Sequence, residues 1–362
     1  MKNINIVIVT GGAGFIGSHT CLSLLEKGYK VIILDSFINS SLKSINRIKE
    51  ILRKFKSKFN YDLSIYEGTL TDKKFIEKVF SEVYSNFGNI DAVIHFAGLK
   101  SVKESVNYPH LYWQENLIST INLVGVMDSF CCNKLVFSSS ATIYKSKERK
   151  LIGGAAEIEL IGEDSEIEAI NPYGNTKLVI EMFLLDTFKS APDKWKIMNL
   201  RYFNPIGAHP SGLIGEAPKG EPNNIFPLLI NTAAKEKKCL EVFGNNWPTK
   251  DGTCIRDYIH VMDVAEGHIR ALNYLENASY NVYNVNLGTG KGASVLDLIN
   301  VFEKINNVKV NYVFTGRREG DVPIIVANNF YARKLLNWVP SRTLEQMCKD
   351  GWNWKTKNPS GY

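Results

Sequence analysis

Short runs of aliphatic residues alternate with amphipathic helical patterns along the first half of the chain. The runs "INIVIVT", "KVIILD", "IDAVIHFAG" and "NKLVFSSS" are separated by segments such as "SHTCLSLLEKG", which has helical spacing. Strands of a parallel sheet that is covered on both faces read as near-continuous apolar runs. The pattern therefore predicts an α/β protein built on a doubly wound parallel sheet.

The pattern changes near residue 205, after which glycine and proline are frequent and the expected elements are shorter. We expect residues 1–205 to hold the parallel sheet and residues 206–362 to form a smaller lobe built on loops. Parts of 255–287 are a candidate return to the first domain. The charged segment 145–169 is short of aromatic residues and lies between a strand and the next helix, so we interpret it as an exposed insertion.

Composition and charge are those of an ordinary globular protein. Of the 362 residues, 44% are hydrophobic and 22% are charged, and the net charge of +6 is dispersed along the chain. The absence of a basic stripe argues against nucleic acid as a partner. The most basic stretch, 42–59, has apolar residues at helical spacing, which favours a helix with a solvated lysine face.

Cysteine spacing and the lengths of apolar runs indicate a cytoplasmic protein without a metal site. The six cysteines form no CxxC pair, and the six histidines have no metal-ligand spacing. No stretch reaches the roughly 20 apolar residues that a membrane-spanning helix needs. The apolar start "INIVIVT" is too short for a secretory signal and runs into a glycine loop. We therefore expect no membrane attachment.

The loop "TGGAGFIGSH" at 10–19 has the features of a dinucleotide-binding turn. Gly11, Gly14 and Gly17 follow one expected strand and open the next helix. Positions without side chains let the backbone approach a pyrophosphate at a helix N-terminus. Asp35 closes the second strand, where a carboxylate can accept from both ribose hydroxyls and repel a 2′-phosphate. The three parts together predict a Rossmann-type domain that binds NAD rather than NADP.

Three further residues form a candidate proton-transfer set. Ser140 ends a strand in "FSSSATIY", and Tyr173 and Lys177 lie one helical turn apart in "NPYGNTK". Lowering a tyrosine pKa from roughly 10 to about 7 takes roughly 4 kcal/mol, which one cation about 4 Å away supplies at an effective dielectric of about 20. We expect Lys177, with an oxidised nicotinamide, to make Tyr173 a base near neutral pH while Ser140 binds the reacting oxygen. Without the serine and glycine motifs, Tyr173 and Lys177 would be interpreted as an exposed pair on a surface helix, with no catalytic role.

Eight motifs, spread nearly end to end, are "TGGAGFIGSH", "HFAGLKSVKESV", "FSSSATIY", "NPYGNTK", "LRYFNPIGAHPSG", "PNNIFPLL", "IRDYIHVMD" and "RREGDVP". Together they resemble the UDP-glucose 4-epimerases of the extended short-chain dehydrogenase/reductase family. The resemblance implies that Tyr173 takes the proton of the sugar 4-hydroxyl while NAD⁺ accepts the hydride from that carbon. A transient 4-keto sugar would turn about its diphosphate link before the hydride returns to its other face.

The resemblance also implies partners and binding residues. It implies tightly bound NAD, a UDP-hexose substrate, and a homodimer formed through the helices after Lys100 and after Tyr173. The expected cofactor contacts are Gly11, Gly14, Phe15, Ile16, Gly17, Asp35, Asn39, Phe96, Ala97, Gly98, Lys100, Asn116, Tyr173 and Lys177. The expected substrate contacts are Ser140, Tyr173, Asn204, Asn224, Arg256, Arg318, Asp321 and Ile325. Arginines that fork onto diphosphate oxygens and a carboxylate that accepts from ribose suit such a substrate.

Four positions depart from the family pattern. Thr69 stands where many members have an acid for adenine, so that contact would be weaker or come from Asp72. Lys145 and Ser119 each replace a usual glycine, and the residues give no explanation for Ser119. Ile325 occupies the position that governs tolerance of an N-acetyl group, where tyrosine goes with strict UDP-hexose use. Isoleucine leaves a dual-specificity epimerase as an alternative.

Three other activities match parts of the pattern. A nucleotide-sugar 4,6-dehydratase needs an acid and a base beside the catalytic hydroxyl, yet Ser140 is followed by Ala141 and Thr142. A decarboxylase acting on UDP-glucuronate would need its own acid there as well. A non-catalytic NAD sensor or scaffold predicts erosion at Ser140, Tyr173 or Lys177, and all three are present. The residues therefore favour the epimerase.

Overall fold

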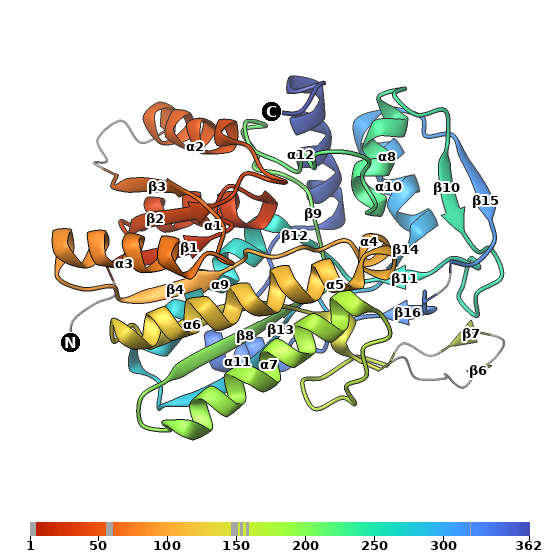
Figure 1. The fold of residues 1–362 in the computed structure, drawn as a ribbon. Helices are drawn as coiled ribbons and strands as arrows, with labels where there is room; N and C mark the ends of the chain where they lie inside the picture. The colour runs from red at the N-terminus through yellow and green to blue at the C-terminus, as the bar shows by residue number, and fades with distance from the viewer. Residues whose placement is uncertain (1–4, 56–60, 146–150, 153–154, 157–158, 319) are drawn as a thin grey trace.

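Seven parallel strands form the central sheet of the computed structural model, which describes residues 5–55, 61–145, 151–152, 155–156, 159–318 and 320–362. The strands lie in the order β13-β8-β5-β4-β1-β2-β3 (Figure 1). Their bounds are β1 Ile6–Thr10, β2 Lys30–Asp35, β3 Leu63–Glu67, β4 Ala92–His95, β5 Lys134–Ser140, β8 Lys196–Tyr202 and β13 Asn281–Leu287. The chain builds outward from β1 to β3 and then crosses back to β4, so β1 and β4 flank the switch point at which such sheets bind ligands.

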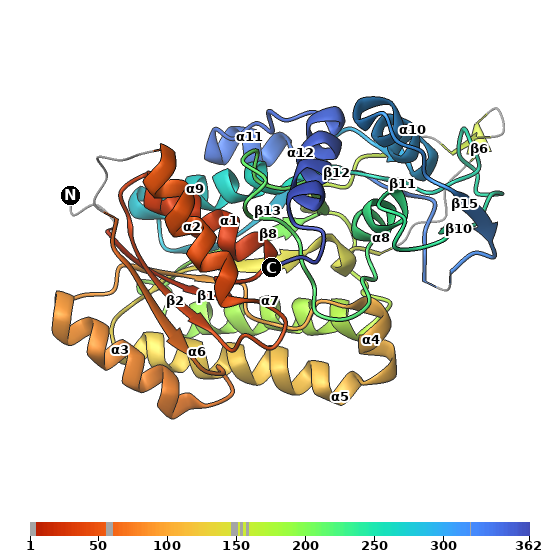
Figure 2. The same ribbon diagram turned by 90° about the horizontal axis from the view of Figure 1, so that it is seen from above.

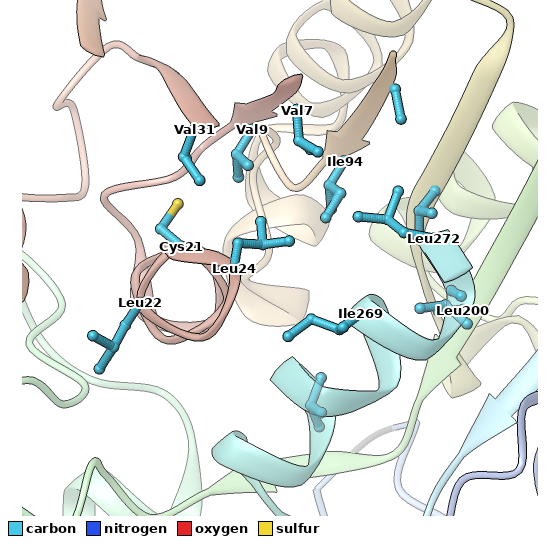
Figure 3. Packing of buried hydrophobic residues seen from close by; sticks show 14 of the residues in the cluster. Val7, Val9, Cys21, Leu22, Leu24, Val31, Ile94, Leu200, Ile269 and Leu272 are labelled. Carbon is cyan, nitrogen blue, oxygen red and sulfur yellow. The ribbon is translucent and has the colours of Figure 1, made fainter. Parts of the chain in front are cut away.

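Helices cover both faces of this sheet (Figures 1 and 2). One layer contains α1 Phe15–Glu26, α2 Leu42–Phe55, α9 Val261–Asn277 and α11 Phe330–Leu336, and the other contains α3 Lys73–Phe87, α6 Ser119–Ser129 and α7 Pro172–Ser190. Alternate residues of β1 serve the two layers: Val7 and Val9 lie in one cluster with Leu24 (Figure 3), whereas Ile6 and Ile8 belong to the other. Burial on both faces explains the continuous aliphatic runs and confirms the predicted doubly wound α/β fold.

Shorter elements form a second hydrophobic core. Phe226, Phe302 and Met347 belong to it. Its helices are α8 Ile225–Ala233, α10 Val295–Asn306 and α12 Leu344–Lys357, beside the parallel pair of β10 Leu240–Phe243 and β15 Tyr312–Thr315. The remaining short strands pair as β14-β11-β16 and β12-β9, with bounds β9 Asn204–Ile206, β11 Ile255–Arg256, β12 Tyr258–His260, β14 Ala293–Ser294 and β16 Ile324–Ile325.

The chain returns to the large sheet after it has entered this second core. Helix α9 packs against α1, and β13 pairs in parallel with β8 along its full length. The expected domain boundary after residue 205 falls inside β9, whose partner β12 immediately precedes α9. The two parts are therefore connected by several crossings of the chain.

The expected insertion at 145–169 is described only in part. Its described residues include the short antiparallel pair of β6 Leu151–Ile152 and β7 Ala155–Ala156. Near its end, the backbone nitrogen of Ile161 donates to the carbonyl of Val326 at 2.8 Å. This part of the segment is thus bonded to the chain next to β16.

The connection from β4 to α6 consists of helical turns. They are α4 Val102–Asn107, α5 Pro109–Tyr112 and the π-helical turn η1 Trp113–Ile118, while the short 3-10 turn η2 Ala141–Ile143 follows β5. A π-helical turn frequently marks a functional site, and η1 lies against α7. Within the described ranges, no helix combines the length and the apolar character that crossing a membrane requires.

Candidate active site

The turn between β1 and α1 approaches the sheet closely because its glycines carry no side chain. An ideal Cβ at Gly11, whose φ is +65°, would lie 2.7 Å from the Ala97 nitrogen. A Cβ at Gly17 would lie 2.2 Å from the Gly11 carbonyl oxygen. Neither position accepts a larger residue unless backbone moves, so the turn forms a cradle at the N-terminus of α1. This cradle fits a dinucleotide pyrophosphate.

The carboxylate of Asp35 is oriented by three donors at the end of β2. Its Oδ2 accepts from Ala13 N at 2.8 Å, and its Oδ1 accepts from Phe37 N at 2.9 Å and from Ser40 Oγ at 2.7 Å. A carboxylate has about four acceptor sites, so one remains for a ribose hydroxyl. The aspartate lines the same groove as the glycine turn.

One groove runs from the glycine turn to the end of β5. All expected cofactor residues except Asn116 line it. Sequence reasoning missed several other lining residues, among them Ser138, Tyr202, Glu216, Ala217, Pro218 and Tyr362. Tyr202 lies inside the quoted motif "LRYFN" and Ser138 inside "FSSSATIY", so their motifs were a usable signal. Glu216 and Tyr362 are distant from the glycine turn in the sequence, and only the tertiary fold brings them to the groove.

Asn116 lies behind the wall of this groove and not in it. Its Oδ1 accepts from Leu99 N at 2.7 Å, and its Nδ2 donates to Leu99 O at 3.1 Å and to Thr176 Oγ1 at 3.0 Å. Both ends of the amide are thus bound by protein in a residue that is 2% exposed. Asn116 fastens the loop after β4 to α7, and its expected contact with a cofactor stays a prediction.

The segment 216–219 crosses the groove through polar contacts. Lys100 Nζ forms an ion pair with Glu216 Oε1 at 3.0 Å. On the other side, Asn39 Oδ1 accepts from Lys219 N at 2.9 Å. Two of the expected cofactor residues therefore also bind this segment, which connects the loops after β2 and β4.

Ser140, Tyr173 and Lys177 meet at the carboxyl end of β5. Ser140 is the last residue of the strand, and its Oγ accepts from Thr142 N at 3.2 Å and from Thr142 Oγ1 at 3.0 Å. Lys177 Nζ donates to the Ser138 carbonyl at 2.7 Å and lies 5.9 Å from the centre of the Tyr173 ring. Ser140 and Lys177 are buried, and Tyr173 is half-buried at the groove.

Helix α7 begins where the sequence places Tyr173 in its first turn. Asn171 caps the helix by accepting from Gly174 N at 2.8 Å, and Pro172 occupies the first helical position. Proline has no N–H to lose there, and its fixed φ suits a helix start. The predicted placement of the tyrosine and the lysine on one helical face follows from this start.

The protein's own groups do not make Tyr173 acidic. Burial raises the pKa of the phenol, and a hydrogen bond with Ser140 lowers it in part. In the protein without NAD⁺, Lys177 does not offset the effect of burial on this pKa, because its ammonium donates to the Ser138 carbonyl. That Lys177 together with an oxidised nicotinamide makes Tyr173 a base stays a prediction. Burial also lowers the pKa of Lys177 to about 8, while Glu181 raises it. The lysine charge is thus sensitive to pH near neutrality.

Three expected substrate residues gather on the second lobe. Asp321 Oδ1 lies 2.8 Å from Arg318 Nη2 and 3.5 Å from Arg256 Nη2. Arg256 Nη1 also donates to the carbonyls of Ile255 and Val322, at 3.0 and 2.8 Å. Two cations about one carboxylate leave a net positive charge, which suits an anionic ligand.

The other substrate candidates lie on neighbouring elements. Asn204 begins β9, and Asn224 precedes α8 as its N-cap without a side-chain capping bond. Ile325 pairs in register with Arg256 and packs against a cluster that contains Ala141. The candidate specificity residue thus packs against the cluster to which the residue after Ser140 belongs. None of these residues lines the cofactor groove described above.

Two departures from the family pattern gain a structural explanation. Asp72 caps α3 by accepting from Lys74 N at 3.0 Å and Phe75 N at 3.3 Å, and Thr69 lines the groove in its place. Asp72 does not line the groove, so the structure does not support the suggestion that it replaces the missing acid at adenine. Lys145 forms ion pairs with Glu166 and Glu168 at 2.7 and 2.8 Å. Across the described ranges, no group of three or more His, Cys, Asp and Glu side chains is arranged to hold a metal ion.

Known proteins resemble the chain along its full length. The sequence profile of the family described as GDP-mannose 4,6 dehydratase matches residues 8–351. UDP-glucose 4-epimerase of Bacillus subtilis is 46% identical over 357 residues, with 98% of each chain covered. UDP-glucose 4-epimerase 2 of Arabidopsis thaliana is 47% identical over 356 residues, covering 98% of this chain and 96% of the relative. The crystal structure of UDP-glucose 4-epimerase from Bifidobacterium longum in complex with NAD⁺ and UDP matches with a TM-score of 0.88 and 42% identity, covering 99% of this chain and 100% of that chain.

The fold is that of the extended short-chain dehydrogenases/reductases. The identity to curated relatives extends over both parts of the chain, and so includes the second lobe as well as the dinucleotide-binding part. The chain belongs to the UDP-glucose 4-epimerase family.

Proposed function

We propose that the protein interconverts UDP-glucose and UDP-galactose by epimerisation at sugar C4, with bound NAD as cofactor. The observation that carries this proposal is the position of Tyr173 and Lys177 at one end of the groove that begins at the glycine turn. The family relationship supports the same activity. Such an isomerase would serve galactose metabolism.

The chain's own residues supply the proton chemistry. Tyr173 takes the proton of the sugar 4-hydroxyl and returns it, while Ser140 holds the reacting oxygen by a hydrogen bond. Lys177 supplies positive charge beside the phenol and holds the carbonyl of Ser138. NAD⁺, when bound, supplies the hydride acceptor and donor together with a second positive charge beside the phenol.

Most of the expected cofactor residues would contact NAD directly, and one would hold the wall of the groove in place. The glycine cradle binds the pyrophosphate, and Asp35 binds the adenosine ribose. Asn39, Phe96, Ala97, Gly98 and Lys100, all of which line the groove, complete the contacts. Asn116 acts indirectly because its amide is already bound by Leu99 and Thr176.

The second lobe binds the UDP part. Arg256 and Arg318 bind diphosphate oxygens, and Asp321 accepts from the uridine ribose. Asn204 and Asn224 complete the nucleotide site. Ile325 borders the sugar and decides whether N-acetylhexosamines enter, so a dual-specificity enzyme is the second candidate function.

Elimination of water is disfavoured although the matching family profile is described by a dehydratase. Ser140 is followed by Ala141 and Thr142, and Thr142 uses its hydroxyl on Ser140 at 3.0 Å. Neither side chain is an acid or a base that could remove a second hydroxyl.

The homodimer remains part of the proposal. Apolar side chains are exposed along the helical layer of α4, α6 and α7, with Val106 61%, Ile121 43% and Met182 57% exposed. Helices α6 and α7 lie side by side (Figures 1 and 2), and α4 contacts α7. Burying such a patch against a second copy is favourable.

The domain division and the location are further parts of the proposal. Residues 1–205 form the NAD domain, with α9 and β13 added from the 255–287 region, and the rest binds substrate. The six cysteines are free thiols, which suits the cytoplasm.

The test is an assay of the purified protein with no added nucleotide. Conversion of UDP-galactose to UDP-glucose, with about one NAD released per subunit on denaturation, is the expected result. Parallel reactions with UDP-N-acetylgalactosamine decide between the two specificities. Bound NAD without conversion of either sugar nucleotide would contradict the proposal and favour a binding protein.

A further inference from the structure

Glu181 lies one turn of α7 beyond Lys177 and forms a buried ion pair with Arg201 of β8. Arg201 Nη2 lies 2.6 Å from Glu181 Oε2, and Arg201 Nε donates to Glu181 Oε1 at 3.0 Å. The side chains are 1% and 7% exposed, respectively. Burying two charges costs desolvation free energy, which offsets most of the free energy gained from their attraction. Such a pair is therefore weak evidence for added stability. Another role is therefore needed to explain it.

The same carboxylate holds the end of the catalytic strand. Ser139 Oγ donates to Glu181 Oε1, and Lys177 Nζ donates to the carbonyl of Ser138 at 2.7 Å. Successive side chains of a strand point to opposite faces, so Ser139 is held from the face opposite to that of Ser140. Two successive turns of α7 thus fasten two successive residues immediately before Ser140.

Arg201 fixes the orientation of Glu181 because its other donors are also bound. Its Nη1 donates to the Tyr144 hydroxyl at 2.9 Å and to the Glu163 carbonyl at 3.1 Å. Each of the three guanidinium nitrogens therefore has an acceptor, and the planar fork gives the carboxylate one direction. The contacts join α7 to the chain on both sides of Ser140.

We propose that Glu181, oriented by Arg201, is a positioning residue that sets Ser140 against the Tyr173–Lys177 face of α7. The inference rests on the proposed epimerase function. Glu181 acts through Ser139 and Lys177 and does not touch the sugar. A displacement of about 1 Å between reacting groups can lower a rate about 100-fold, so such fastening has a kinetic consequence.

Glu181 also compensates the charge of Lys177. The other titratable groups around this lysine are Tyr173 on α7, His95 on β4 and Tyr202 on β8. Burial lowers the pKa of His95 to about 3 and raises the pKa of both phenols, so in the protein without NAD⁺ all three are neutral near pH 7. The Glu181 carboxylate raises the Lys177 pKa against the effect of burial. Its removal should let the lysine lose its proton at lower pH.

Glu181→Gln tests the inference because it keeps the size of the side chain and removes its charge. With UDP-galactose we expect kcat to fall about 30-fold, as for loss of charged hydrogen bonds, with KM within about twofold of wild type. The alkaline limb of kcat should move down by about one pH unit, which a merely structural role would not cause. NAD content should stay unchanged. The matched control is Glu266→Gln, which breaks the partly exposed Glu266–Arg270 pair at 3.1 Å on α9 and should behave as wild type.

Ser139→Ala keeps the inference testable if Glu181→Gln does not fold. It removes one hydrogen bond to Glu181 and leaves the ion pair with Arg201 intact. We expect kcat to fall about three- to tenfold at unchanged KM. Wild-type kcat in Ser139→Ala, or wild-type kcat and pH profile in folded Glu181→Gln, would overturn the inference alone. A wild-type protein without epimerase activity would overturn the proposed function and the inference with it.

Discussion

Lys177 Nζ donates a hydrogen bond to the carbonyl oxygen of Ser138, at 2.7 Å. The contact joins the first turns of α7 to β5 two residues before Ser140 ends the strand. Because the ammonium is also buried, its pKa falls to about 8. The protonation of Lys177, which holds the strand end at Ser138, should therefore change with pH near neutrality.

The lowered pKa of Lys177 should make the free energy of unfolding depend on pH. Unfolded lysine has a pKa of about 10.4, so between about pH 8 and about pH 10.4 the unfolded chain holds a proton that the folded chain has released. The unfolding free energy contributed by Lys177 therefore rises with pH across this window and is constant below it. Lys177→Met removes this contribution.

Urea unfolding of both proteins at several pH values measures the effect. The free energy of unfolding of wild type relative to Lys177→Met should increase by up to about 3 kcal/mol from about pH 7 to about pH 10. Other titrating groups cancel in the difference. A difference that does not change with pH would show that the lysine keeps an ordinary pKa.

The glycine cradle predicts a contrast between two alanine variants. Gly17→Ala places a Cβ 2.2 Å from the Gly11 carbonyl oxygen, so the cradle must open and NAD should be lost. At Gly125 on α6, nothing lies within 4 Å of the added Cβ. Gly125→Ala should therefore keep NAD and stabilise the fold by about 0.5–1 kcal/mol. The NAD released on denaturation measures cofactor content, and thermal unfolding measures stability. Full NAD content in Gly17→Ala would refute the role of the cradle.

Substrate choice should respond to Ile325. This side chain packs against the cluster that contains Ala141 and Ile143, directly after Ser140. Ile325→Ala should enlarge the space beside the sugar and raise kcat/KM for UDP-N-acetylgalactosamine, relative to UDP-galactose, by about tenfold. Competition assays with both substrates give this ratio, and an unchanged ratio would exclude Ile325 from the sugar pocket.

The apolar helical layer predicts the oligomeric state. Ile121→Glu together with Met182→Glu should convert a dimer to a monomer, because each buries a charge at the proposed contact. Ile305→Glu on α10 is the control, since Ile305 is 43% exposed on the other lobe. Sedimentation at micromolar concentration distinguishes the forms. Wild type that sediments as a monomer would contradict the dimer.

Local sequence signals predicted the parts of the molecule that depend on local physics. The aliphatic runs predicted the central sheet because strands buried on both faces need apolar residues throughout. The spacing of four residues in "NPYGNTK" predicted that Tyr173 and Lys177 share one helical face, and both lie on α7. Both interpretations depend only on residues near one another in the chain.

Other features depend on contacts between distant residues and could not be predicted in this way. Asn116 had the chemistry of a cofactor ligand, yet Leu99 and Thr176 occupy its amide. The spacing placed Lys177 near Tyr173, but it could not show that the ammonium donates to the Ser138 carbonyl or that burial raises the pKa of the phenol. The pairing of Glu181 with Arg201 carries no motif at all, since the two residues come from different elements.

The most direct test of the central claim is the turnover of Tyr173→Phe on UDP-galactose, measured beside wild type with the NAD content of both proteins. Removing only the phenol oxygen should lower kcat by about 10²- to 10⁴-fold and leave NAD bound and the fold intact. Turnover equal to that of wild type, in a variant that still holds NAD, would contradict the role of Tyr173 and with it the proposed mechanism.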